Sequence, residues 1–333
     1  MAPDADAGKA KANRSDPFAP LTSELLPVSG GHEIYVESVG RADGMPAVYL
    51  HGGPGSGCQP DHRRLFDPER FHAILFDQRG AGRSRPQGRL EHNTLPDLIA
   101  DMETIREKFS IPRWMVVGGS WGATLALAYA QTHPARVSGI VLRATFLGTR
   151  AELEGAFLDA LPRFYPGLSE DFAGVLPPAE RGQLLDAYYR RILDPDPAVH
   201  GPAARAWHDT ERILSEHAPN RVRLDPASLN SSRALPATPF MEAHYFQHDC
   251  FMRPGQLLAE AARLSGIPGL IVQGRYDLLC PPATSRALAA LWPDAEIRIV
   301  ESAGHSLYDR GVRDAVMKAI ADLASEISAK GSS

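Results

Sequence analysis

Hydrophobic positions along the chain follow two alternating patterns. The stretch HEIYVESVG, residues 32–40, alternates apolar and polar residues like a half-buried strand. Continuous apolar runs that stop at glycines or turn residues occupy residues 46–50, 72–76, 114–120, 137–145, 269–274 and 295–300. Stretches with apolar residues at helical spacing lie between these runs, at residues 95–109, 121–133 and 284–292. Strands alternating with helices predict an α/β fold, with a mostly parallel central sheet and helices on both faces.

The segment from residue 148 to residue 255 departs from this alternation. It has almost no strand-like run, and proline-rich loops separate its helical pieces AELEGAFLDALPRFY, ERGQLLDAYYRRILD and GPAARAWHDTERILSEH. We therefore expect an inserted helical cap at 148–255 over a core made of residues 19–147 and 256–330. Residues 1–18 are polar and alanine-rich and are expected to form a disordered tail, as are the last residues, SAKGSS.

Composition narrows the function classes. The 333 residues carry a formal net charge of −5 and no basic stripe, which argues against a nucleic-acid partner. Cys58, Cys250 and Cys280 form no CxxC motif or Cys/His cluster, so we expect free thiols in a reducing compartment and no metal site. The sequence shows no secretory signal and no run long enough to span a membrane, which indicates a cytoplasmic protein with no membrane partner. No cofactor is implied, and the oligomeric state stays open.

The apolar run WMVVGGS leads into a motif that can carry chemistry. Gly118-Gly119-Ser120-Trp121-Gly122 fits the G-x-S-x-G nucleophile elbow. In that motif a sharp strand-to-helix turn lifts the serine hydroxyl above the sheet, and small neighbours make room for the turn. The context fits, because an apolar run precedes Ser120 and a helix-forming stretch follows it. Ser120 is the candidate nucleophile, and the alternative is a structural glycine turn.

A nucleophile elbow works with two backbone N–H groups that hold the oxyanion. One belongs to the residue after the nucleophile, Trp121. The second is expected from the glycine loop in LHGGPGSG, with Gly53 as donor and Gly52 as its neighbour in the site. Pro54 has no N–H and cannot serve. The alternative is that HGGPG is only a tight turn.

A serine at neutral pH needs a base, and in this arrangement the chain order is serine, acid, histidine. Asp277 follows the run GLIVQG, and His305 follows IRIVESAG. His305 would take the serine proton and pass it to the leaving group, while Asp277 would hold the imidazole tautomer. Asp77 precedes Ser120 in the chain and is the weaker acid, so we expect it to pin the loop DQRGAGRS. His51 is expected to shape the oxyanion loop.

Taken together, these motifs resemble a known family. HGGPG, DQRGAGRS, GGSWGATLALAYAQTHP, GRYDLLCP and AGHS look like the proline iminopeptidases (prolyl aminopeptidases), serine peptidases of the α/β-hydrolase fold. The resemblance runs from about residue 32 to about residue 310. It implies an exopeptidase that removes an N-terminal residue, preferably proline, through an acyl-enzyme. The substrate would be a small peptide or an aminoacyl amide or ester.

Such an enzyme must bind a free amine, and an ammonium taken out of water needs a paired charge. The family places two glutamates in its cap for this purpose. The resemblance matches them to Glu211 in AWHDTE and to Glu242 in MEAHYF. It also matches Phe146 and Cys280 to positions that line the family's proline pocket. Without the resemblance, the glutamates would be taken for a solvated helix face and the other two for core packing.

Two departures from the family pattern bear on specificity. Thr210 stands where the family usually has a tryptophan directly before the first glutamate. The early cap stretch EGAFLDA has Phe157 as its one aromatic residue, where the family tends to have a cluster. Flat aromatic walls recognise a pyrrolidine ring. We therefore expect a wider, flatter pocket and a P1 preference broader than proline.

The leading hypothesis is a serine aminopeptidase of this type. The first alternative is an amidase or esterase that uses the same triad on a small non-peptide substrate, with an aminoacyl transferase as a variant. The cap departures favour this alternative, and the two glutamates disfavour it. A non-catalytic binding protein is disfavoured because such proteins commonly lose a triad residue. Epoxide hydrolase or haloalkane dehalogenase chemistry needs a carboxylate where Ser120 stands.

Overall fold

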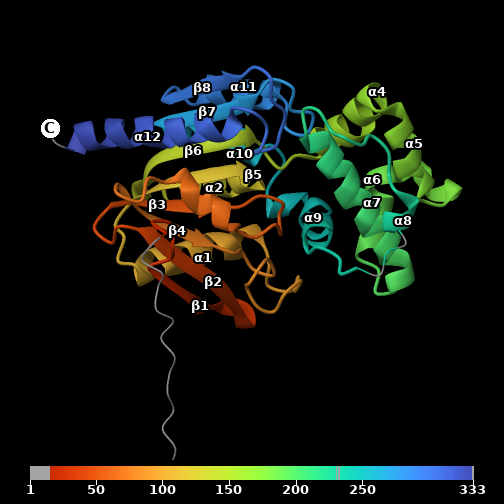
Figure 1. Ribbon diagram of the computed structural model, residues 1–333, viewed down its shortest axis with the longest axis horizontal. Helices are drawn as coiled ribbons and strands as arrows, with labels where there is room; N and C mark the ends of the chain where they lie inside the picture. The colour runs from red at the N-terminus through yellow and green to blue at the C-terminus, as the bar shows by residue number, and fades with distance from the viewer. Residues whose placement is uncertain (1–15, 230, 232, 332–333) are drawn as a thin grey trace, which may run out of the picture.

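The computed structural model describes residues 16–229, 231 and 233–331. These residues form an eight-stranded sheet in the order β1-β2-β4-β3-β5-β6-β7-β8 (Figure 1). The strand bounds are β1 Thr22–Val28, β2 His32–Gly40, β3 Met45–Leu50, β4 Phe71–Phe76, β5 Trp114–Ser120, β6 Val137–Thr145, β7 Gly269–Gly274 and β8 Ala295–Val300. Strands β1 and β2 pair antiparallel with each other, and β2 pairs antiparallel with β4. All pairs from β4 through β3 to β8 are parallel, which confirms the mostly parallel sheet.

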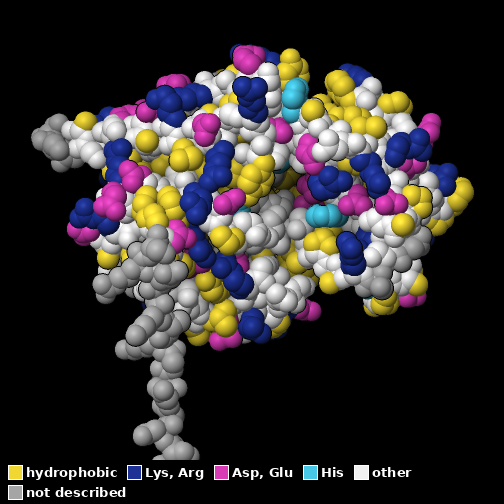
Figure 2. Space-filling view, viewed as in Figure 1, with side chains coloured by type: hydrophobic (Ala, Val, Ile, Leu, Met, Phe, Trp, Pro, Cys, Tyr) yellow, Lys and Arg dark blue, Asp and Glu magenta, His cyan; other side chains and the backbone are white. Residues whose placement is uncertain are grey.

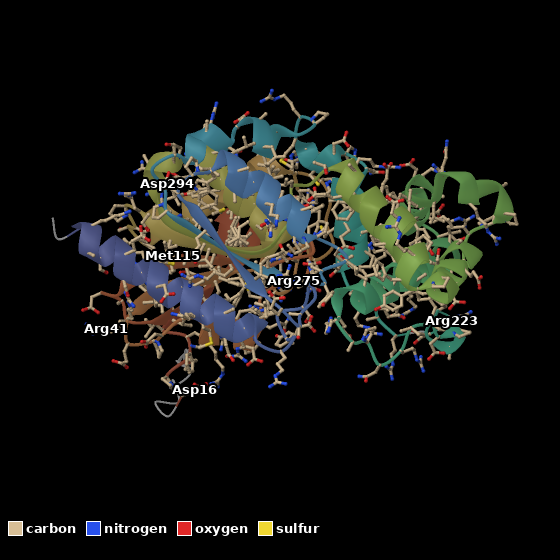
Figure 3. All side chains as sticks on the ribbon, turned by 90° about the horizontal axis from the view of Figure 1, so that it is seen from above. Asp16, Arg41, Met115, Arg223, Arg275 and Asp294 are labelled. Atoms are coloured by element: carbon tan, nitrogen blue, oxygen red, sulfur yellow. The ribbon has the colours of Figure 1, made fainter. Side chains whose placement is uncertain are left out.

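Helices cover both faces of the sheet. Along β5 the buried side chains alternate, so that Trp114 and Val116 belong to one hydrophobic cluster and Met115 and Val117 to the other. The first cluster includes residues of α1 (Leu95–Lys108), α2 (Trp121–Thr132) and α11 (Pro282–Leu291), and the second includes α12 (Val312–Gly331). A strand buried on both faces is the arrangement expected in the middle of a parallel sheet. Figure 3 looks onto α12 and labels Met115 beneath it.

The described residues between β6 and β7 form helices and no strand. Figure 1 shows most of them beside the sheet, with α9 nearer to the sheet than α4–α8. Their bounds are α3 Arg150–Glu154, α4 Leu161–Phe164, α5 Pro166–Gly174, α6 Leu184–Ile192, α7 Pro197–Ser215, α8 Pro226–Leu229, α9 Thr238–Phe246 and α10 Gln256–Ala259. A π-helical turn over Gly155–Ala160 connects α3 to α4. We call residues 148–255 the cap.

The cap packs through an aromatic cluster that continues the hydrophobic core of one sheet face. The rings of Phe172 and Tyr188 stack with centroids 4.0 Å apart, and Phe157 stacks on Trp207 at 4.4 Å. On α7 the buried residues Ala203, Trp207, Thr210 and Leu214 are spaced three or four positions apart, which brings them to one side of the helix. The cap is therefore joined to the core by buried side chains as well as by its two chain connections.

The two ends of the chain show where the sequence patterns were weak. Residues 1–15 of the predicted tail lie outside the described residues, and residues 16–19 form a turn in which the Ala19 N–H donates to the Asp16 carbonyl. The tail expected at SAKGSS is wrong for residues 328–331, which extend α12. Val316, Ile320 and Leu323 bury one face of that helix against the sheet, so the helix is held in place along most of its length.

Candidate functional site

Ser120 stands at the end of β5, where the chain turns directly into α2. Its backbone has φ 56° and ψ −125°, an unusual conformation for a residue with a side chain. The turn is possible because the neighbouring glycines leave no side chain in its way. A Cβ on Gly118 would lie 2.2 Å from the Gly122 carbonyl oxygen, and one on Gly122 would lie 2.1 Å from the Leu50 carbonyl oxygen. The spacing of G-x-S-x-G therefore has a steric cause in this chain.

The loop after β3 brings Gly52 and Gly53 to the same place. Both glycines and Ser120 line one cavity, and a Cβ on Gly52 would lie 3.6 Å from the Ser120 Cβ. Gly53 has φ 104°, a conformation that a side chain would disfavour. Trp121 is the first residue of α2, so its N–H has no acceptor within the helix. The two expected oxyanion donors thus belong to segments that meet at the serine.

His51 holds the shape of this loop. The ring is buried, and its Nε2 accepts a hydrogen bond from the Gln78 N–H at 2.9 Å. The Nδ1 lies 2.9 Å from the Gly52 carbonyl oxygen and 3.3 Å from the Gly57 nitrogen. Because Nε2 accepts, a neutral ring carries its proton on Nδ1 and donates it to the nearer Gly52 carbonyl. Burial lowers the pKa of His51, in keeping with a neutral ring. Because the carbonyl and N–H of a trans peptide point in opposite directions, this bond also fixes where the Gly53 N–H points.

The Trp121 side chain is tied to the same loop. Its indole Nε1 donates to the Gln78 Oε1 at 2.8 Å, while the Gln78 Nε2 donates to the His51 carbonyl at 2.9 Å. The side chain of Gln78 thus bridges the residue after the serine and the start of the glycine loop. Asp77, its chain neighbour, accepts from the N–H groups of Cys58 and Arg83 and from the Arg83 guanidinium. The structure therefore places Asp77 as the pin of its loop, away from His305.

Asp277 and His305 meet at the carboxyl ends of β7 and β8. The Nδ1 of His305 lies 3.1 Å and 3.0 Å from the two carboxylate oxygens of Asp277. The Asp277 Oδ1 also accepts from the N–H groups of Leu279 and Cys280, which orient the carboxylate. Both side chains are buried, and His305 lines the cavity that contains Ser120. Among the described residues no hydrogen bond joins Ser120 to His305, a contact that often tightens only when substrate is present.

The cavity at Ser120 lies between core and cap. It has a volume of about 270 Å³, and its lining includes Gly53, Ser120 and His305 from the core and Glu211 and Glu242 from the cap. Figure 2 shows a hollow between the sheet-bearing core and the cap helices on the face that it presents. Six of the predicted site residues line this cavity: Gly52, Gly53, Ser120, Glu211, Glu242 and His305. Asp277 does not line it but contacts His305. Phe146 and Cys280 line the adjoining hollow described below.

Glu211 and Glu242 lie side by side although α7 and α9 are far apart in sequence. Glu242 is fully buried, and its Oε2 accepts from the Trp207 indole at 2.6 Å. Its Oε1 has no hydrogen-bond donor among the described residues. Burial, followed by the charge of Glu211, raises the pKa of Glu242 well above its ordinary value, and burial also raises the pKa of Glu211. Two adjacent carboxyl groups with raised pKa values tend to hold one proton between them, so the site is prepared for a cation.

A small apolar hollow of about 30 Å³ adjoins this cavity at Ser120. Ser120, Gly53, Glu211 and Leu279 line both spaces. The hollow is further lined by Phe146, Glu152, Leu153, Ala156, Phe157, Phe246 and Cys280. This narrow space gives no support to the wider, flatter pocket expected from the cap sequence. The third aromatic wall, Phe246, comes from the end of α9 and could not be located from the stretch EGAFLDA.

Besides Phe246, Trp207 and Arg143 at this site were not predicted from the sequence. Trp207 precedes Glu211 by one helical turn on α7, supports Glu242 and stacks on Phe157. Its i,i+4 spacing to Glu211 was the available signal. Arg143, at the end of β6, lines the cavity and donates a hydrogen bond to the His305 carbonyl. Thr210, the departure noted beside Glu211, is fully buried, and its hydroxyl has no partner among the described residues.

The described residues contain no group of three or more His, Cys, Asp or Glu side chains that could hold a metal ion. None of the described helices is both long enough and apolar enough to cross a membrane.

The chain matches a known family model and several curated relatives over most of its length. The family model described as the alpha/beta hydrolase fold matches residues 46–312. The chain is 43% identical to a "Probable proline iminopeptidase" of Leptolyngbya boryana, over 91% of this chain and 94% of the relative. It is 43% identical to a "Proline iminopeptidase" of Arabidopsis thaliana, over 89% of this chain and 78% of the relative. A Xylella fastidiosa "Proline iminopeptidase" is 42% identical, over 90% of this chain and 95% of the relative.

Solved structures share the fold at lower sequence identity. The structure titled "Crystal structure of Proline iminopeptidase Mycobacterium smegmatis" superposes with a TM-score of 0.60 at 17% identity, covering 92% of this chain and 99% of that one. An α/β-fold family hydrolase from Bacillus anthracis superposes with a TM-score of 0.61 at 16% identity, covering 91% of this chain and 99% of that one. These structures show that the sheet and its helices have the α/β-hydrolase arrangement.

Proposed function

Because the chain belongs to the proline iminopeptidase family of α/β hydrolases, we propose that its serine aminopeptidase activity releases N-terminal proline, or a similarly compact residue, from peptides. The observation that carries this proposal is the pairing of two spaces at Ser120: a carboxylate pair in one and a narrow apolar hollow in the other. The pair suits a free amine, and the hollow suits a compact side chain. The cap at 148–255 contributes to both.

The first half of the reaction follows from the placement of Ser120 and His305. His305 Nε2 takes the hydroxyl proton as Ser120 Oγ attacks the carbonyl carbon of the first residue. The oxyanion that forms is held by the N–H groups of Gly53 and Trp121. Asp277 accepts from His305 Nδ1 and stabilises the imidazolium. The C–N bond then breaks, and His305 returns its proton to the departing amine, leaving the first residue as an ester on Ser120.

Water completes the second half at the same groups. His305 takes a proton from the water as the water oxygen attacks the ester carbonyl, and the same two N–H groups hold the new oxyanion. The C–O bond to Ser120 breaks, and the serine oxygen regains a proton from His305. The free amino acid leaves. No group beyond the protein and water is needed for either half.

The carboxylate pair explains why the substrate must begin with a free amine. An ammonium between Glu211 and Glu242 displaces their shared proton and supplies the donor that Glu242 Oε1 lacks. An acylated nitrogen brings no positive charge, and its acyl group occupies the space beside a buried carboxylate. Recognition of this kind limits cleavage to the first residue of the chain. The three buried free thiols are in keeping with a reducing compartment, and we place the protein in the cytoplasm.

The test is release of the arylamine from matched substrates: prolyl, alanyl and phenylalanyl arylamides and the N-acetyl form of each. We expect the prolyl compound to be cleaved fastest and the acetylated forms to be inert. The Ser120→Ala variant is the control and should fold normally while kcat falls by about 10⁴-fold or more. Rapid cleavage of the acetylated forms would instead indicate an amidase or esterase. An active Ser120→Ala variant would remove the proposed nucleophile.

A further inference from the structure

The backbone of His305 is held from two sides. The carbonyl of Ser215, the last residue of α7, accepts from the N–H groups of His305 at 3.1 Å and Ser306 at 2.9 Å. On the other side, the Arg143 guanidinium donates to the His305 carbonyl. Ser215 belongs to the cap and Arg143 to the core. The proposed general base therefore depends on both parts of the molecule for its position.

Asp309 connects the loop of His305 to the same end of α7. Its Oδ2 accepts from the Gly304 N–H at 2.6 Å and from the His217 N–H at 3.3 Å. The approach is close, because a Cβ on Gly304 would lie 3.1 Å from both the Asp309 Oδ2 and the His217 nitrogen. The carboxylate is thus a bridge between the residue before His305 and the chain that leaves α7.

A ring contact from the loop that carries Asp277 supports this bridge. The His217 ring stacks on Tyr276 with centroids 5.0 Å apart, and the Tyr276 N–H donates to the Ala303 carbonyl at 2.9 Å. Tyr276 directly precedes Asp277. Figure 3 labels Arg275, the residue before Tyr276, close to where core and cap meet. The loops of both proposed triad partners therefore contact the segment that follows α7.

The same helix carries Glu211, one of the two carboxyl groups of the amine site. Glu211 lies four residues, about one helical turn, before Ser215. A displacement of the end of α7 would move Glu211 and the backbone anchor of His305 together. The distance between Glu211 and the general base is therefore set by one helix rather than by the sum of several loops.

We infer that Asp309 is a positioning residue that fastens the His305 loop to the end of α7, so that the helix bearing Glu211 also sets the place of the general base. The inference rests on the triad proposed above. Asp309 is not one of the residues that line the cavity with the carboxylate pair, nor one of those that line the apolar hollow. Its loss should therefore reduce turnover and leave substrate affinity largely unchanged.

The test compares Asp309→Ala with Asp309→Asn on prolyl-arylamide. We expect Asp309→Ala to lower kcat by about 10- to 100-fold, because small displacements of a catalytic group have effects of that size. KM should stay within about twofold. Asp309→Asn keeps one acceptor oxygen and should recover most of kcat, since the role is geometric. Asp314→Ala removes the same charge from an exposed position of α12 and is the matched control, with kcat unchanged.

Active sites are counted with a fluorophosphonate, so that kcat refers to folded enzyme alone. An unchanged kcat in Asp309→Ala overturns the inference, as does a loss that disappears when rates are normalised to titrated sites. An Asp309→Asn variant as slow as Asp309→Ala also overturns it, because charge and not geometry would then matter. If Ser120→Ala is inactive while Asp309→Ala is fully active, the triad stands and only this inference fails.

Discussion

Glu242 is a residue whose position favours function over stability. Its side chain is fully buried next to Glu211, and burial raises its pKa well above the ordinary value. The carboxyl group of Glu242 therefore binds its proton more tightly in the folded protein than in the unfolded chain. Stability contributed by the protonated group is present at acid pH, is lost as pH rises through the folded pKa, and is absent above it. Between the unfolded and the folded pKa of Glu242, the free energy of unfolding therefore falls as pH rises, because folding must take up a proton there.

The Glu242→Gln variant separates the effect of this residue on catalysis from its effect on stability. It keeps an oxygen for the Trp207 indole but removes one of the two acidic groups of the pair. We expect kcat/KM for free prolyl-arylamide to fall by about 10²-fold, the order of a lost charged hydrogen bond. The unfolding temperature at pH 7 should rise by about 2 °C or more. Near pH 4 the difference in unfolding temperature should shrink.

Glu69→Gln makes the same change at an exposed position and should alter neither quantity. A Glu242→Gln variant that loses activity and stability together at pH 7 would contradict the burial argument. Glu211→Gln provides an independent comparison, since burial raises the pKa of this residue as well.

At the same scale, candidate site residues could be predicted from the sequence where a motif dictates a backbone shape. The positions of Ser120, Gly53, Asp277 and His305 follow from glycine spacing and strand ends. The role of Trp207 did not follow, because it depends on how α7 turns its face toward α9. Phe246 was missed for a similar reason, since helices distant in sequence supply the walls of one hollow.

Among the elements, the β5–α2 elbow is the one in which sequence and geometry agree most closely. Gly122 brings α2 against the carbonyl of Leu50 at the end of β3, so the helix, the nucleophile and the oxyanion loop share one contact. The apolar runs predicted the inner strands because residues buried on both faces leave an unbroken hydrophobic signal. Strand β1 was not predicted, because TSELLPV is half exposed at the sheet edge and contains a proline.

Gly122→Ala tests the elbow contact. Its methyl group would lie 2.1 Å from a backbone oxygen that cannot move without shifting β3. We expect the free energy of unfolding to fall by about 1–3 kcal/mol or more. The rate of acylation should fall as well, because the oxyanion loop follows Leu50. Denaturant unfolding and a stopped-flow acylation assay would measure the two effects.

Gly174→Ala is the matched control in the same experiment. Gly174 is the last residue of α5, and a Cβ there would meet no atom within 4 Å. We expect it to be neutral or to stabilise the protein by up to about 1 kcal/mol. Equal effects of the two substitutions would show that the close approach at Gly122 does not matter.

For the whole molecule, the functional geometry arises where core and cap meet. The cavity, the hollow and the anchors of His305 each combine residues from both parts. The sequence predicted that an inserted helical segment would lie near the site, because its pattern departs from the strand–helix alternation. The contacts that anchor His305 were not predictable. The Ser215 carbonyl and the N–H group of His305 are about 90 residues apart and belong to no side-chain motif, and the Asp309 carboxylate accepts from the His217 N–H, which is as distant in the sequence.

The narrow hollow at this junction makes P1 selectivity a property that one cap residue can change. Leu153 of α3 is buried and lines the hollow. It takes no part in the hydrogen bond between Trp207 and Glu242. In Leu153→Ala the hollow gains the space of the missing side chain, so a bulky P1 residue meets less steric resistance. We expect the ratio of kcat/KM for phenylalanyl- over prolyl-arylamide to rise by about 10-fold or more.

Leu158→Ala makes the same substitution in the same segment, at a side chain that is 40% exposed, and should leave the ratio unchanged. If both variants shift the ratio equally, or neither does, the hollow is not the P1 pocket. If only Leu153→Ala shifts it, the compact preference comes from the volume of this hollow, although the cap sequence alone suggested a wider pocket.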